Sequence, residues 1–166
     1  VSDGKGKIFN NLEDKNEIVV INTGTKKVTD RYDLTPCGGP SALAMDIADN
    51  RVFTACRKNK GVSVLNAASG KIIVTLPIGS GVDAARFDPA TKLLFTSNGD
   101  GTVTIIHEDA PDKYRKVQTL QTQKGARTMA LDPVTHEIYL SVAKRVPGAG
   151  RRTVPGTFDV LVYGMK

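Results

Sequence analysis

The chain has 166 residues, 40% hydrophobic and 24% charged, which is the composition of one globular domain and not of a disordered or fibrous chain. No apolar run approaches the roughly 20 residues of a membrane span, and the printed sequence contains no recognisable signal peptide. The formal net charge of +6 favours anionic partners and carries no information about fold.

Short apolar segments separated by turns rich in Gly, Pro, Asp and Asn run through the first half of the chain, and this pattern predicts strands. Unit 1, residues 1–36, has strands at Lys7–Phe9, Ile18–Ile21 and Lys27–Leu34. Unit 2, residues 37–78, has four, at Ser41–Met45, Val52–Ala55, Val62–Leu65 and Lys71–Leu76.

The second half repeats this order. Unit 3, residues 79–123, has a strand running into Asp88 and then Leu93–Thr96, Val103–Ile106 and Tyr114–Leu120. Unit 4, residues 124–166, has Arg127–Leu131, Ile138–Ser141 and Phe158–Val162. No segment keeps a 3.6-residue period, so almost no helix is expected.

An aspartate after the first strand marks each unit. Asp3, Asp46, Asp88 and Asp132 are spaced 43, 42 and 44 residues apart, and the last two are followed by proline in a turn. Units of about 40–45 residues with four antiparallel strands are typical of β-propeller blades. The sequence therefore predicts an all-β chain, a propeller segment of about four blades with 3, 4, 4 and 3 strands.

The segments IVVINTGTKKV, VSVLNAASGKII, FDPATKLLFTSNGDGTVTII and GARTMALDPVTHEIYL resemble the repeats of the YVTN (YncE-like) bacterial β-propeller family. The resemblance covers essentially the whole chain. It implies the C-terminal half of a larger ring, a periplasmic or secreted location, and, for some members, binding of nucleic acid. It specifies the fold more strongly than the function.

Both terminal units are one strand short, and the chain begins with Val1 rather than methionine. We therefore expect a mature or truncated product. Exposed sheet edges and faces invite association, so the expected partner is a second copy or a missing N-terminal half of the ring. A closed four-bladed ring is the alternative.

In a propeller, the loops between blades share one face with the loops between strands two and three. That face is basic, and its candidate ligand-binding residues are Arg57, Lys60, Lys124, Arg127, Arg145, Arg151 and Arg152. Arginine suits phosphates and carboxylates as a bidentate partner. The long segment Lys144–Gly156 is either an insertion without a role or a flap over this face.

The sequence indicates a non-enzymatic binding or scaffold module that presents this basic face to a protein or an anionic ligand. A lactonase-like propeller hydrolase is an alternative, since Asp83 and Asp100 lie on the face, but no nucleophile motif accompanies them. Single-stranded nucleic-acid binding is another, weakened by the lack of aromatic residues in these loops. His107 and His136 form no paired-histidine motif, so no metal site or cofactor is expected.

The two cysteines, Cys37 and Cys56, fall at neighbouring positions of the second unit, on the basic face. Their Cα atoms are expected within bridging distance, about 5.5–6 Å. We hypothesise a disulfide, which suits a periplasmic or secreted protein; two buried thiols are the alternative.

Overall fold

The computed structural model describes residues 1–150 and 152–164. Over these residues every regular element is a β-strand, which confirms the all-β prediction, and no helix capable of crossing a membrane is found there. The strands are β1 (Lys7–Leu12), β2 (Glu17–Asn22), β3 (Lys27–Asp33), β4 (Pro40–Asp46), β5 (Arg51–Cys56), β6 (Gly61–Asn66), β7 (Ile72–Pro77), β8 (Val82–Asp88), β9 (Leu93–Asn98), β10 (Thr102–Ala110), β11 (Lys113–Gln121), β12 (Thr128–Leu131), β13 (Ile138–Arg145) and β14 (Thr153–Tyr163).

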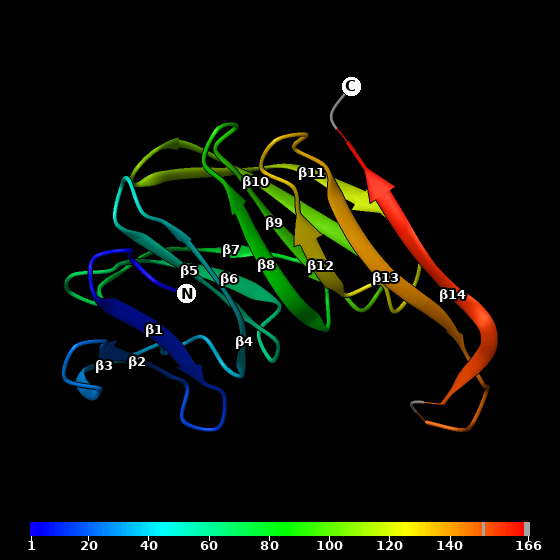
Figure 1. The fold of residues 1–166 in the computed structure, drawn as a ribbon, viewed down its shortest axis with the longest axis horizontal. Coiled ribbons are helices and arrows are strands. Elements are labelled where there is room, and N and C mark those ends of the chain that lie inside the picture. The colour runs from blue at the N-terminus through cyan, green and yellow to red at the C-terminus, as the bar shows by residue number, and fades with distance from the viewer. Residues whose placement is uncertain (151, 165–166) are drawn as a thin grey trace.

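The strands form four antiparallel sheets of 3, 4, 4 and 3 strands, as the repeat predicts. Each sheet is a meander of consecutive strands, β1–β3, β4–β7, β8–β11 and β12–β14, and each falls within one of the expected units. The sheets follow one another in chain order, with β1–β3 at one end of the molecule and β12–β14 at the other (Figure 1). The chain is a segment of a β-propeller.

The sheets pack face to face and bury one apolar cluster in each of the three gaps between them. The inner strands β4, β8 and β12 contact one another in succession. Between the second and third sheets, Phe53 stacks on Phe87 with ring centroids 5.1 Å apart, and Tyr114 packs edge-on against Phe53 at 5.8 Å. These three rings pack together in the central gap, while Phe9 and Phe95 are buried in the first and last gaps.

Sheet stacking explains the composition of the middle strands. Both faces of β5 and β6 are covered, so their residues are buried almost without interruption and do not alternate between apolar and polar. The outer strand β3, by contrast, is exposed along nearly all its length and reads KVTDRYD. Nearly uninterrupted burial thus marks strands that lie between two neighbouring sheets.

The repeated aspartates close the turn after the first strand of each unit. Asp46 Oδ1 accepts hydrogen bonds from the backbone N–H groups of Ala48 at 2.9 Å and Asp49 at 3.2 Å. Asp88 and Asp132 accept equivalent bonds from Ala90 and Val134. A short carboxylate side chain that binds backbone two residues on is a standard turn-forming group, which is why aspartate recurs at this spacing.

The same turns also link neighbouring sheets. Lys92, in the turn between β8 and β9, places its Nζ 2.8 Å from carboxylate oxygens of both Asp46 and Asp49 on the preceding sheet. One unit later, His136 Nδ1 lies 2.7 Å from Asp88. Both side chains project from residues with positive φ, 55° and 59°. Each of these residues lies four positions after the aspartate of its own turn. The repeated turn therefore places a basic side chain where it can contact an acid of the preceding sheet.

Glu108 completes a buried ionic cluster with Asp46, Asp49 and Lys92. Burial on its own raises the pKa of Asp46, but hydrogen bonds from Lys92 and Glu108 outweigh it, and the pKa of Asp46 is lowered. The pKa of Glu108 is raised by its burial, and the neighbouring Asp46 acts in the same direction. Two buried carboxyls thus depend on one ammonium group that reaches them from the next sheet.

Replacing Lys92 with methionine is expected to destabilise the protein by about 2 kcal/mol at pH 7, since it leaves Asp46 and Glu108 buried without their cation. Because the pKa of Asp46 is lowered in the folded protein, its contribution exists above the unfolded value and is lost as the pH falls. The deficit of Lys92→Met should therefore persist from pH 7 down to about pH 4 and shrink as the pH falls below the unfolded pKa of Asp46, about 4. Urea unfolding at several pH values measures it. The exposed Lys71→Met is the control; an equal or pH-independent deficit would contradict the assigned role.

Candidate basic cleft

Loops from successive sheets meet on one face of the molecule, at the end opposite the aspartate turns. The backbone N–H of Asp100 donates to the carbonyl of Ser80 at 3.2 Å, and that of Gly99 donates to Gly81 at 3.0 Å. The N–H of Gly125, in the next inter-sheet loop, donates to Gly99 at 3.0 Å. The inter-sheet loops and the β9–β10 turn are therefore one hydrogen-bonded surface, as the propeller prediction requires.

Gly101 allows this close approach. Its φ is +93°, and a Cβ atom built there would lie 2.9 Å from the backbone nitrogen of Lys124. Any other residue would be strained in this conformation and would push the loop that carries Lys124 away. The glycine-rich turn Asn98–Gly101 thus has a packing role.

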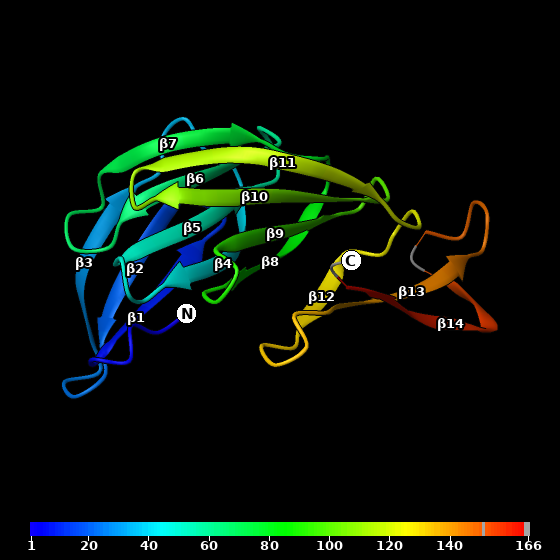
Figure 2. The same cartoon turned by 90° about the horizontal axis from the view of Figure 1, so that it is seen from above.

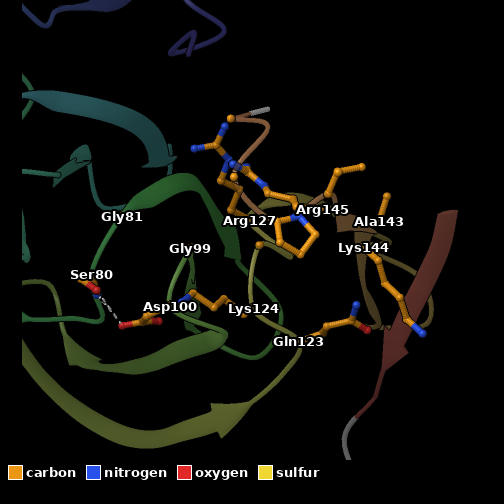
Figure 3. Close-up of a pocket in the computed structure, with 15 residues that line it drawn as sticks. Ser80, Gly81, Gly99, Asp100, Gln123, Lys124, Arg127, Ala143, Lys144 and Arg145 are labelled. Atoms are coloured by element: carbon orange, nitrogen blue, oxygen red, sulfur yellow. Dashed lines mark hydrogen bonds between the residues drawn. The ribbon is translucent and has the colours of Figure 1, made fainter. Parts of the chain in front are cut away.

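A cleft of about 880 Å³ opens on this face between the third and fourth sheets (Figure 3). Ser80 and Asp100 lie on one side of it, and Lys144, from the end of β13, lies on the other (Figure 3). We call this the basic cleft. Its lining residues are Ser80, Gly81, Gly99, Asp100, Gln123, Lys124, Gly125, Arg127, Ala143, Lys144, Arg145, Val146, Pro147, Gly148 and Gly150.

The charges of the basic cleft are unbalanced. Lys124, Arg127, Lys144 and Arg145 line it, against the single carboxylate of Asp100. Burial raises the pKa of Asp100, but hydrogen bonds from the hydroxyl of Thr102 and from the N–H and hydroxyl of Ser80 outweigh this, so its pKa is lowered. Asp100 therefore favours its ionised form and already accepts three hydrogen bonds from within the protein.

A second group of charges lies next to the cleft. Arg57 contacts Asp83 at 3.2 Å and Glu13 at 3.6 Å, and Arg127 lies 3.9 Å from the same Asp83. Thr128 adds a hydroxyl 3.4 Å from Asp83. Charged side chains of alternating sign thus run from the β1–β2 turn, through Arg57 after β5 and Asp83 in β8, to Arg127 before β12. The positive charge of Arg57 is balanced by the two acids that it contacts.

The structure brings together three of the residues that the sequence placed on the basic face: Lys124, Arg127 and Arg145. Arg57 is held in the neighbouring ion-pair group, and neither Lys60 nor Arg152 lines the cleft. Arg151 lies outside the described residues. Gln123 and Ser80 also line the cleft, and the charge pattern of the loops does not indicate them because both side chains are neutral.

The long loop expected over Lys144–Gly156 is shorter in the structure, because strands occupy both of its ends. β13 continues to Arg145 and β14 begins at Thr153, so the pair forms an extended arm closed by a short connection. The predicted loop is too long because Pro155 and Gly156 are typical of loops, yet both lie in β14. Val146, Pro147, Gly148 and Gly150 of this segment line the cleft, and a role as a flap stays a prediction.

The acids required by a hydrolase are already engaged within the protein. Asp83 is paired with arginines, and Asp100 accepts bonds from Ser80 and Thr102. Among the described residues, the carboxylates that approach one another closely enough to hold an ion are Asp46, Asp49 and Glu108, on the opposite face. Lys92 supplies the positive charge in that cluster. The lactonase-like hydrolase stays an alternative prediction.

No family model matches the sequence, and no curated protein matches it. Among solved structures, the chain is similar to hydrazine synthase from Kuenenia stuttgartiensis, with a TM-score of 0.78 over 99% of this chain. The sequence identity is 16%, and the match covers 48% of that chain. A likeness at this identity concerns the fold alone. Membership of the YncE-like family stays a prediction.

A disulfide joins Cys37 to Cys56, whose Cα atoms are 5.4 Å apart. It ties the loop before β4 to the end of β5, next to Arg57. In the same place, the N–H groups of Arg57 and Lys58 donate to the carbonyls of Gly39 and Gly38 at 2.9 and 3.0 Å. The bridge therefore holds the loop against which Arg57 is positioned.

The double variant Cys37→Ala/Cys56→Ala is expected to lose about 3 kcal/mol of unfolding free energy, because the bridge closes a loop of moderate length in the unfolded chain. Chemical denaturation of oxidised, reduced and variant protein measures the loss. Reduced wild type should resemble the variant. Complete alkylation of both cysteines in folded protein without reductant would contradict the bridge.

Proposed function

We propose that this propeller segment is a non-enzymatic binding module and that the basic cleft takes a ligand carrying phosphate or carboxylate groups. The observation that carries the proposal is the charge of the cleft: four cationic side chains converge on one cavity whose only carboxylate is occupied by its own hydrogen bonds. An anion entering the cleft would replace water around several cations at once.

Free donors support the proposal. Within residues 1–150 and 152–164, Lys124, Lys144 and Arg145 have no carboxylate within ion-pair distance. Arg127 has a long contact of 3.9 Å to Asp83, which leaves donors of its guanidinium group available. An arginine presents a planar fork that suits an oxyanion, whereas lysine acts as a point charge. The cleft offers both kinds of group on opposite walls.

The lining favours a compact anion over a nucleic-acid strand. Non-specific single-strand binding combines cationic grooves with aromatic platforms on which bases stack. The residues that line the basic cleft include no aromatic side chain. The cations of the cleft would still attract the phosphate backbone of a nucleic acid. The salt dependence of the affinity, and not binding alone, therefore distinguishes a nucleic acid from a compact anion.

Citrate is the first probe. We expect it to bind wild type, and Arg127→Ala/Arg145→Ala to lower its affinity by about tenfold or more, since bonds to charged groups contribute about 1.5–3 kcal/mol. Isothermal titration at low and moderate ionic strength measures both. The matched control is Arg31→Ala/Arg115→Ala, which removes two guanidinium groups from the outer strands β3 and β11.

Equal affinities of the two double variants would place the anion site elsewhere. A single-stranded oligothymidylate serves as the second probe on the same proteins. If it binds wild type with a steep salt dependence while citrate does not bind, the nucleic-acid interpretation replaces the compact anion.

A further inference from the structure

The stack of sheets leaves one face uncovered at each end, a feature separate from the basic cleft (Figure 2). On the last sheet, Phe158, Val160 and Val162 of β14 are 67%, 50% and 50% exposed. We call this the trailing face. On the first sheet, Ile8 of β1 and Val28 of β3 are 39% and 48% exposed, and Ile21 of β2 lies between them in the register. We call this the leading face.

The trailing face corresponds to buried faces in the two preceding sheets. Counting from the repeated aspartate, the cross-strand pair Tyr139–Val162 matches Phe95–Ile105 and Phe53–Val64. Val160, opposite Ser141, matches Val103 and Val62. Val62, Val64 and Val103 are 0% exposed, and Ile105 is 9% exposed, because the next sheet covers them. In the last sheet, apolar residues occupy the equivalent positions, but no further sheet of this chain covers them.

The leading face corresponds to the other half of the same interface. The pair Ile8–Ile21 matches Val52–Leu65 and Leu94–Ile106. These four matching residues are at most 1% exposed and pack against the preceding sheet. Within the chain, residues equivalent to the trailing face pack on residues equivalent to the leading face in each gap. The two ends therefore carry the two complementary halves of an interface that the chain already forms internally.

We infer that the occupant of each end face is a second copy of this chain. Two copies placed head to tail would set each trailing face on the partner's leading face and bury both free faces of both copies. Head-to-tail contacts that close form a ring. Two copies supply eight sheets, which is within the four to eight blades of known propellers. The partner's first sheet then stands beside the β13–β14 arm, so that the basic cleft opens onto a closed channel.

The chemistry of the trailing face fits this occupant better than a polar ligand. The side chains that share it, namely Tyr139, Ser141, Ala143, Phe158, Val160 and Val162, carry no charge. Contiguous apolar surface of this kind on a folded protein marks an association site. The proposed contact would also repeat the face-to-face packing already seen between the sheets within the chain, and it requires no rearrangement of the strands.

Light scattering on a sizing column tests the inference with the chain as it is. We expect twice the 17.8 kDa of one chain at a concentration of about 50 µM, a range in which an interface of ordinary size is populated. Val160→Lys/Val162→Lys should give the mass of one chain, as should Ile8→Lys at the other end. All three positions are well exposed, so each variant should keep the circular dichroism of wild type.

Val134→Lys is the control, since Val134 is 83% exposed in the turn before β13 and belongs to neither end face. It should keep the double mass. A wild-type chain with the mass of one copy would overturn the inference, as would a double mass that persists in both end-face variants. Should one end-face variant fail to fold, the variant at the opposite end decides the question by itself.

Discussion

Each sheet of this protein has two apolar faces, and both must be removed from water. A twisted sheet of three or four strands cannot do this alone, so the fold depends on stacking one sheet on the next. The buried pattern of β5 and β6 follows directly, because a strand in the middle of a stacked sheet has no side open to solvent. The repeated turn aspartates then fix the spacing at which successive strands return.

Charged groups gather on two opposite faces of the molecule, one formed by the aspartate turns and the other by the loops around the basic cleft. At the aspartate turns, Lys92 and His136 reach back to acids of the preceding sheet, so these charges are satisfied within the protein. At the opposite face, the ion pairs of Arg57, Asp83 and Glu13 lie next to cations that have no such partner in the part of the chain described. Four cationic side chains, Lys124, Arg127, Lys144 and Arg145, thus share one cleft with the carboxylate of Asp100.

The sequence was sufficient for the fold because the fold is repetitive. Asp46, Asp88 and Asp132 align three turns, and the strands around them follow from short apolar runs. The site was harder to predict because it depends on pairing between loops far apart in the chain. Arg57 looked like a free cation, yet Asp83 lies opposite it, and Lys144 and Arg145 looked like loop residues, yet they end a strand. The charges in the sequence predict which face is basic, whereas contacts between loops determine which cations are left without an ion-pair partner and can bind a ligand.

The position of the basic cleft at the junction with the last sheet has a consequence for dynamics. In stacked repeat proteins, stability is close to a sum over neighbouring interfaces, so a terminal unit with one covered face opens more readily than an internal one. One wall of the cleft belongs to the well-covered third sheet, and the other to the terminal β12–β14 sheet. In a single copy of the chain, a ligand bridging the two walls would therefore stabilise the β12–β14 sheet, and its binding energy would appear as slower amide exchange in β12–β14 rather than as a change in the centre of the molecule.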